Sequence, residues 1–159
     1  MEKKIIKGVN SYLIIIRMGK NAMDRVNIFV ADHNLMVREG LIALFNQAEG
    51  FQVVGEAGDS DDALIKVKKS QPDIVLLESK LPMFTDFDTI RLIHASSPKT
   101  RVIVVAADLK KHDVRRALQG GARGYILKTA PFAELVNAIQ NICRGEYYLS
   151  SEIKSDIIE

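Results

Sequence analysis

Two acidic side chains stand directly after apolar runs that have the length of buried strands. Glu78 follows Ile74–Leu77, and Asp32 follows Asn27–Ala31. A short, continuous apolar run is typical of a parallel strand that is covered on both faces. Open α/β sheets carry their chemistry beyond the carboxyl ends of such strands. We therefore expect both carboxylates at one edge of a sheet.

The elements that would position these acids alternate regularly along the chain. Five strand-like runs alternate with five segments of helical apolar spacing, joined by short loops, which predicts a doubly wound α/β fold. For five such units we expect the flavodoxin-like (βα)5 parallel sheet, with strand order 2-1-3-4-5 counted along the chain. That order brings Ala31, Asp32 and Glu78 together where the order reverses. The predicted strands are 27–31, 52–57, 74–78, 101–106 and 124–127, and the predicted helices 35–45, 60–70, 87–95, 110–120 and 131–144.

Composition restricts the class of protein. The 159 residues are 47% hydrophobic and 26% charged, as in ordinary globular proteins. The single Cys143 excludes an intramolecular disulfide and favours a reducing, cytoplasmic location. The net charge of +2 is uneven, because residues 1–22 hold five Lys and Arg against Glu2, which leaves −2 for residues 23–159. The predicted domain therefore has no basic surplus for nucleic acid.

The amino-terminal extension, residues 1–25, does not share this pattern. Its apolar stretch Tyr12–Ile16 is too short to span a bilayer and lacks the features of a signal peptide. It could add a strand or helix to the domain, serve as a basic membrane-surface or partner anchor, or reflect a mis-assigned start before Met23. We favour the mis-assigned start over the anchor, because the domain pattern begins at Val26. Residues 1–22 are then expected to be poorly ordered.

Several short segments fall in a fixed order along the chain. They read ADH at 31–33, LMVREGL at 35–41, VVGEA at 53–57, GARGYILK at 121–128 and GEYYLS at 145–150. This set resembles the receiver domain of bacterial two-component response regulators, and within them the NarL/FixJ subfamily. The resemblance covers residues 26–152, and it leaves 153–159 as a tail or the start of a linker. It implies a signalling domain rather than an enzyme.

The resemblance also implies a set of site positions. In this family an aspartate ending the third strand accepts a phosphoryl group from a sensor kinase, and acids after the first strand help to hold Mg²⁺. A hydroxyl ending the fourth strand and a lysine ending the fifth bond the phosphate, and an aromatic side chain on the fifth strand responds to the hydroxyl. In this chain Glu78 stands at the phosphate-accepting position, and Ala31 and Asp32 stand at the acidic positions after the first strand. The hydroxyl position is Ala106, the lysine position is Lys128 and the aromatic position is Tyr125.

Three of these positions depart from the family pattern. Glu78 is one methylene longer than aspartate, about 1.5 Å, which disfavours in-line attack. Ala31 removes an acid, so we expect no cofactor, or Mg²⁺ held only weakly by Asp32 and Glu78. Ala106 can neither bond a phosphoryl oxygen nor transmit its presence to Tyr125. Lys128 is expected to pair with Glu78, which either caps its strand or mimics a phosphorylated aspartate.

The sequence therefore predicts an atypical, phosphorylation-independent receiver that acts as a protein-interaction module. Its partner would be a sensor kinase or another signalling protein. A homodimer would form through helix 110–118, strand 124–127 and helix 131–143, or through helices 35–45 and 131–143. We expect no direct DNA binding and no membrane contact. The alternatives are the regulatory half of a truncated helix-turn-helix transcription regulator, and a receiver still able to accept phosphate. The three histidines, His33 among them, do not form a metal-ligand set by spacing.

Overall fold

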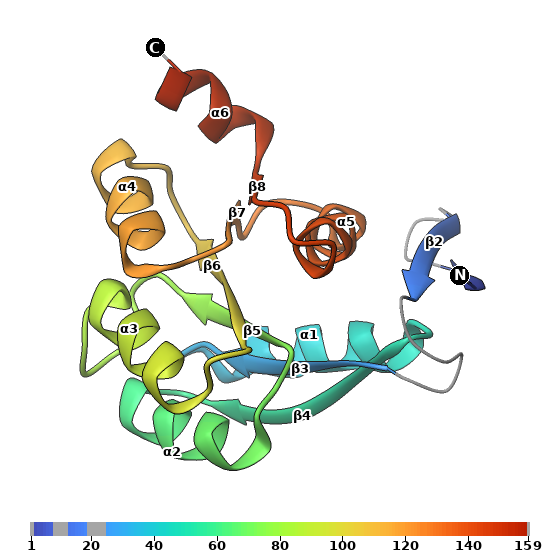
Figure 1. Cartoon of the computed structure of the whole chain (residues 1–159), viewed down its shortest axis with the longest axis horizontal. Coiled ribbons are helices and arrows are strands. Elements are labelled where there is room, and N and C mark those ends of the chain that lie inside the picture. Colours follow the sequence, from blue (N-terminus) through green and yellow to red (C-terminus); the bar gives the residue numbers. More distant parts are fainter. Residues whose placement is uncertain (1, 8–12, 19–24, 159) are drawn as a thin grey trace.

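The protein is described here by a computed structural model, which gives the backbone of residues 2–7, 13–18 and 25–158 and the side chains of 25–154. Its main sheet has six parallel strands in the order β4-β3-β5-β6-β7-β8 (Figure 1). The strands are β3 (Val26–Ala31), β4 (Phe51–Ala57), β5 (Ile74–Glu78), β6 (Arg101–Ala106), β7 (Gly124–Leu127) and β8 (Tyr148–Leu149). The first five of these confirm the predicted order 2-1-3-4-5.

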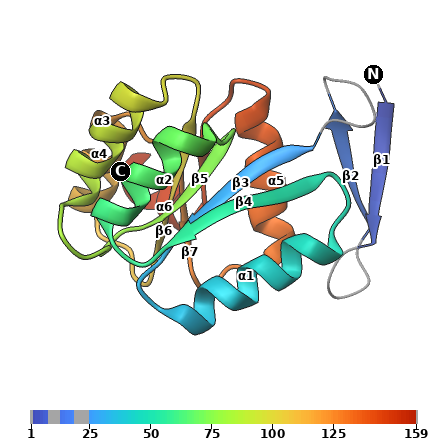
Figure 2. The same ribbon diagram turned by 90° about the horizontal axis from the view of Figure 1, so that it is seen from below.

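Helices cover both faces of this sheet (Figure 2). They are α1 (Leu35–Gln47), α2 (Ser60–Ser70), α3 (Asp86–Ser96), α4 (Lys111–Gly120), α5 (Phe132–Cys143) and α6 (Ser151–Ile158). Alternate residues of each strand point to opposite faces. Phe29, Val75 and Val104 therefore pack with α2, α3 and α4, whereas Ile28 and Leu76 pack with α1 and α5. The doubly covered sheet explains why the strands are almost continuously apolar.

The strand register sets the position of the candidate site. Ala31 pairs with Leu77 across β3 and β5, so the residues that follow them, Asp32 and Glu78, leave the sheet side by side. On the other flank of β5, Glu78 pairs with Val105 of β6. The carboxyl ends of β3 and β5 thus converge where the strand order reverses, as expected for an open α/β sheet.

The amino-terminal segment contains a separate antiparallel pair of strands, β1 (Glu2–Lys7) and β2 (Leu13–Met18). β2 lies beside α5, as Figure 2 also shows. The parts of the extension at residues 1, 8–12 and 19–24 lie outside the described residues. The expectations of poor order and of a functional start at Met23 stay predictions. No helix in the described part of the chain is long and apolar enough to cross a bilayer.

The carboxyl-terminal segment is more structured than predicted. Residues 153–159 were expected as a tail or linker, but α6 begins at Ser151 and continues to Ile158. Ile153 is fully buried in the same apolar cluster as Val114 and Ala117 of α4. β8 was not predicted either, because two residues give no periodic signal. Burial of one large aliphatic side chain explains why the domain continues past residue 152.

If α6 belongs to the folded domain, Ile153→Ala should lower the free energy of unfolding by about 2 kcal/mol or more, because it leaves a cavity in the core. Urea denaturation followed by circular dichroism measures this change. Ile65→Ala is the matched control, since Ile65 is 57% exposed in α2 and should change stability by less than about 0.5 kcal/mol. Equal stability of the two variants would show that α6 does not contribute to the domain.

Candidate functional site

Asp32 and Glu78 are buried although both are acidic, with relative exposures of 3% and 5%. Backbone N–H groups at the start of α1 hold both of them. The N–H of His33 donates to Glu78 Oε2 at 2.8 Å, and that of Asn34 donates to Asp32 Oδ1 at 2.8 Å. Asn34 itself caps α1 by accepting from the N–H of Met36. The turn between β3 and α1 therefore fixes both carboxylates before any ligand binds.

Lys128 lies between these carboxylates. Its Nζ is 2.8 Å from Asp32 Oδ2 and 2.9 Å from Glu78 Oε1. The lysine follows β7, and its own N–H donates to the carbonyl of Ala106, which keeps it at the sheet edge. The predicted pairing of Lys128 with Glu78 is therefore present, and Asp32 completes it. One ammonium group joins the ends of three strands.

The electrostatics of this cluster favour its charged form. Burial alone would raise the pKa of Glu78, but hydrogen bonds from His33 and Lys128 and the charge of Lys128 lower it below its ordinary value. Burial would likewise lower the pKa of Lys128, yet hydrogen bonds to Asp32 and Glu78 raise it. Both shifts stabilise an ionised pair. The cluster is a preformed ion-pair network rather than an open set of carboxylates.

His33 is the site residue that sequence reasoning missed. Its Nδ1 lies 2.7 Å from both oxygens of Glu78, while its side chain is 55% exposed. The interpretation based on histidine spacing compared His33 only with the other histidines. The available signal was its position directly after Asp32, at the end of a strand that neighbours β5. A residue at that position can reach Glu78, regardless of where the other histidines lie.

These residues do not suit Mg²⁺, the ion that the family resemblance implies. Mg²⁺ requires nearly octahedral oxygen coordination and is reluctant to lose its water. Ala31 offers no side-chain oxygen, and Lys128 already lies against both Asp32 and Glu78. The remaining approach to Glu78 is taken by an imidazole nitrogen. A hard cation would have to displace an ammonium group from two buried carboxylates.

The two predicted switch positions lie in one apolar cluster. Ala106 is fully buried at the end of β6, and Tyr125 of β7 is 1% exposed. Tyr125 therefore points inward, the orientation that the sequence left open. Burial first, and then the nearby acids Asp113, Asp86 and Asp108, raise its pKa above the ordinary range. The phenol stays neutral at physiological pH, and no hydroxyl at position 106 is available to sense the site.

Arg38 is a second residue that the sequence did not single out. Its Nη1 donates to the carbonyl of Asp32 at 2.6 Å, and its Nε lies 3.1 Å from Glu56 Oε1. The side chain thus links α1, the end of β3 and the edge strand β4. It acts on the position of Asp32 rather than on a ligand. Arg38 lies one helical turn after Asn34. The direction of its side chain could not be read from the sequence and is known only from the fold.

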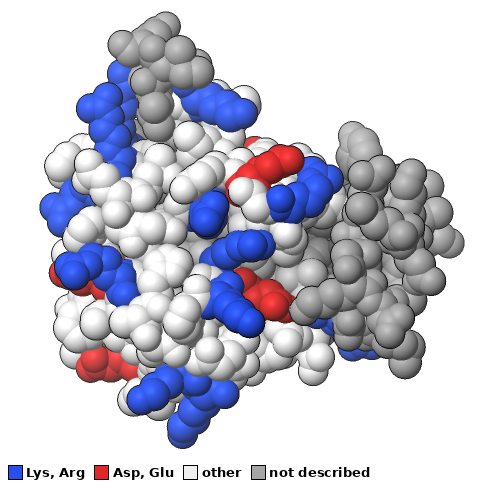
Figure 3. Space-filling view, viewed as in Figure 1, with Lys and Arg blue, Asp and Glu red and all other residues white. Residues whose placement is uncertain are grey.

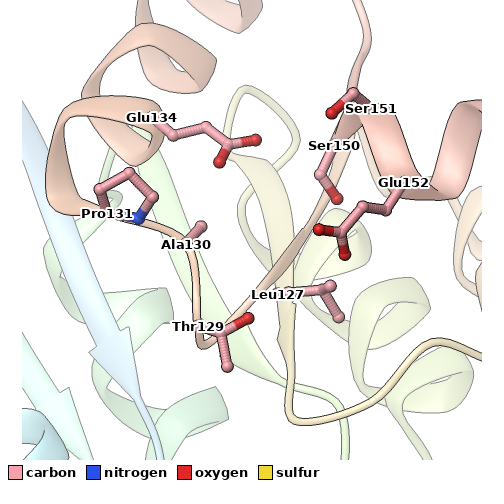
Figure 4. Close-up of a pocket in the computed structure, with 8 residues that line it drawn as sticks. All are labelled: Leu127, Thr129, Ala130, Pro131, Glu134, Ser150, Ser151 and Glu152. Atoms are coloured by element: carbon pink, nitrogen blue, oxygen red, sulfur yellow. The ribbon is translucent and has the colours of Figure 1, made fainter.

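A separate hollow of about 130 Å³ is lined in part by the segment that follows Lys128 (Figure 4). It is lined by Leu127, Thr129, Ala130, Pro131, Glu134, Ser150, Ser151 and Glu152. Glu134 and Glu152 belong to the first turns of α5 and α6, where a negative charge stabilises the helix dipole. The carboxylate of Glu134 accepts a hydrogen bond from the Tyr148 hydroxyl at 3.0 Å. The helix dipoles therefore account for these acids, and Glu78 is not among the residues that line the hollow.

Comparison with known proteins agrees with this fold. Residues 28–140 match the family model of the response regulator receiver domain, so the chain belongs to that family. It is a receiver domain of the two-component type, with a flavodoxin-like sheet. The family is identified by most of the domain, not by the site residues alone.

Individual relatives give the same result. The chain is 32% identical over 132 residues to response regulator GacA of Pseudomonas viridiflava, covering 83% of this chain and 62% of that one. A LuxR-family two-component response regulator from Aurantimonas sp. SI85-9A1 superimposes with a TM-score of 0.80 at 30% identity, over 85% of this chain and 96% of that one. The receiver domain of the putative response regulator NarL from Mycobacterium tuberculosis gives a TM-score of 0.73 at 30% identity, over 77% and 99%. The chain thus spans about three fifths of the length of the curated regulators it matches.

The ion-pair network predicts how stability depends on pH. Glu78→Gln keeps the shape but removes the charge, so at pH 7 it should lower the free energy of unfolding by about 1–3 kcal/mol. The folded-state pKa of Glu78 lies below its ordinary value of 4.5. Its stabilising contribution is therefore present above that pH and is lost as the pH falls through the folded-state pKa. The difference between the wild type and Glu78→Gln should shrink in acid.

Urea unfolding at neutral pH and at several values below 4.5 measures this difference. Glu39→Gln is the matched control, because Glu39 is exposed on α1 and its substitution should change stability by less than about 0.5 kcal/mol. A deficit that stays constant down to the lowest pH would mean that the charge of Glu78 contributes nothing.

Proposed function

We propose that this receiver works without phosphorylation, as a protein-interaction module of a signalling system. The observation that carries the proposal is the bonding of Glu78. Its carboxylate already contacts Lys128 at 2.9 Å and His33 at 2.7 Å, so it has little freedom to act as a nucleophile. In-line transfer requires the reacting atoms to approach to about 3–3.5 Å in the correct orientation. The longer glutamate fills the space in which a phosphoryl group would have to sit.

The electrostatics of the site support the same proposal. Phosphoryl transfer depends on positive charge that neutralises the transferring group. Here Lys128 is committed to two buried carboxylates, and the cluster is unsuited to Mg²⁺. Ala106 presents only a methyl group, and Tyr125 is already buried. Glu78 could still hold a negative charge where a phosphoaspartate would carry one, but Ala106 offers no route from it to Tyr125.

The interaction surfaces are proposed from the arrangement of the helices. The surface formed by α4, β7 and α5 adjoins α6, which contacts α4, and α5 also lies beside β2. A partner or a second copy that binds the α4–β7–α5 surface or the α1–α5 surface would therefore contact α6 or β2. Nucleic acid is a poor candidate partner: in Figure 3, Lys and Arg form several separate groups on this face, with acidic side chains near some of them. We propose as the partner a sensor kinase or another signalling protein.

A second candidate function is the regulatory half of a transcription regulator. The relevant observation is that the chain covers 62% of the length of GacA. The reading frame downstream of this segment tests it, because a helix-turn-helix region within the next ~70 residues would establish a longer regulator. The interaction role proposed above would then control a DNA-binding partner domain in the same chain.

The phosphorylation-independent role makes a direct prediction. Incubation with acetyl phosphate and Mg²⁺, followed by intact mass measurement, should give no phosphate adduct on the wild type. Glu78→Asp alone should remain unmodified, because Ala31 and Ala106 are unchanged. The triple variant Ala31→Asp, Glu78→Asp, Ala106→Thr is the positive control, since it restores both acids and the hydroxyl. An adduct on the wild-type protein would overturn the proposal.

A further prediction concerns Glu78 as a mimic. Because Ala106 cannot transmit the state of the site, neither Glu78→Gln nor Glu78→Asp should change the oligomeric state. Light scattering coupled to size-exclusion chromatography, over a range of protein concentrations, measures it. A shift with Glu78→Gln that Glu39→Gln does not produce would instead identify Glu78 as a fixed activating charge.

A further inference from the structure

The hollow between the first turns of α5 and α6 contains a buried hydroxyl group that bonds nothing. Ser150 is only 5% exposed, and its Oγ has no hydrogen-bond partner among the residues that the structure describes. Figure 4 shows this hydroxyl pointing into the hollow. We propose that the hollow binds the guanidinium group of an arginine on a partner protein, with the Ser150 hydroxyl and the Glu134 carboxylate as acceptors. The proposal rests on the interaction role proposed above and specifies the chemistry of the partner.

The start of α6 does not use the Ser150 hydroxyl. A serine that precedes the first turn of a helix ordinarily caps it, because its side chain accepts a backbone N–H. Here the N–H groups of Ile153 and Lys154 donate to the carbonyl of Ser150, at 2.9 and 3.1 Å, and not to its Oγ. A buried hydroxyl without a partner loses its hydration without compensation. The helix dipole explains the acids of the hollow but not this hydroxyl, whereas a ligand in the hollow explains both.

The charge of the hollow favours a cation. Glu134 and Glu152 are among the eight residues that line it, and none of the eight is basic. Each helix N-terminus contributes roughly half a positive charge, so the two carboxylates leave about one negative charge in excess. An anion would be repelled by these carboxylates, whereas the single charge of a guanidinium group balances them.

The surface of the hollow suits an arginine in particular. Leu127, Ala130 and Pro131 contribute apolar surface, against which the methylene groups of the side chain can pack. The hydroxyl and carboxylate oxygens accept hydrogen bonds, and a guanidinium presents five N–H donors in a planar fork. An ammonium group has three donors and is more strongly hydrated, so a lysine should bind less tightly. The volume of about 130 Å³ is larger than a single bridging water needs.

The Glu134 carboxylate is held in place before a ligand arrives. The hydroxyl of Tyr148 donates to Glu134 Oε1 at 3.0 Å. Burial, and then the hydrogen bond to Glu134, raise the pKa of Tyr148 to about 12, so the phenol remains a donor at neutral pH. An acceptor fixed in this way loses little conformational entropy on binding. Thr129, Ser151 and Glu152 are exposed, so an arginine can enter from the solvent while its own chain stays outside.

NMR titration of the full chain tests the proposal. The probe is a tripeptide of glycine, arginine and glycine with both ends blocked. Its control is the same peptide with citrulline, which has nearly the same shape as arginine but no charge. The arginine peptide should shift the backbone amide signals of Thr129, Ser151 and Glu152 until they saturate, and the citrulline peptide should not. Equal shifts from the two peptides, or no shift from either, would overturn the proposal, and this comparison needs no altered protein.

Two substitutions then locate the binding. Glu134→Gln removes the charge but keeps an acceptor for Tyr148, and it should weaken the arginine peptide by about tenfold. Glu146→Gln is the matched control, since Glu146 is exposed and does not line the hollow, and it should bind as the wild type does. Ser150→Ala should also weaken binding, while its midpoint of urea unfolding stays the same or rises because an unpaired hydroxyl is removed. Wild-type affinity in Ser150→Ala would mean that this hydroxyl meets only water, and the proposal would be wrong.

A further arm separates the two sources of a guanidinium group. Propylguanidinium carries the same head group and charge as the peptide but no peptide chain. A protein partner requires the arginine peptide to bind more tightly, and equal or tighter binding of propylguanidinium would overturn the assignment to a protein. The phosphodonor experiment reads protein mass instead. A phosphate adduct would contradict the phosphorylation-independent role and leave these titrations unchanged, so the two failures are distinguishable.

Discussion

The charges of the buried Asp32 and Glu78 and of the partly exposed Lys128, held together at the end of the sheet, constrain everything else at this site. A buried charge without a partner costs several kcal/mol, so none of the three can leave without exposing or neutralising the others. The distances of 2.8 and 2.9 Å from Lys128 Nζ show that each acid has the same cation as its partner. A ligand cation must compete with this ammonium, and a ligand anion must compete with two carboxylates. A ligand of either sign must therefore displace an ion-pair contact that is already present.

The same cluster also connects local structure to the fold. Asn34 begins α1 by capping it, and the backbone N–H groups of that turn bind the acids that end β3 and β5. Arg38, one turn further on, ties the carbonyl of Asp32 to Glu56 on β4. Loss of the site charges would therefore loosen the start of α1 and the contact with β4. Binding chemistry and stability are properties of one network here.

Most of the fold could be predicted from the sequence, because doubly covered strands and amphipathic helices each leave a periodic signal. The register that places Asp32 beside Glu78 followed from strand order alone. Side-chain direction in the turn after β3 follows no period, so the sequence position of His33 indicates that it can reach Glu78 but not that its ring points there. For the same reason Arg38 was missed, and β8 and α6 were too short to give a signal. Tyr125 illustrates a different limit: its inward position depends on the packing of neighbours that are distant in sequence.

β8 has a consequence for the edges of the main sheet. It pairs with β7, so β7 is an interior strand, and an edge only two residues long offers a foreign chain few free backbone groups. The opposite edge is β4, seven residues long, where an incoming strand could find a full ladder of partners. Gln52 and Glu56 leave polar side chains along that strand, and Glu56 is held there by Arg38. The two edges of the sheet are thus protected from self-association by different means. The β8 edge is very short, and the β4 edge carries polar side chains.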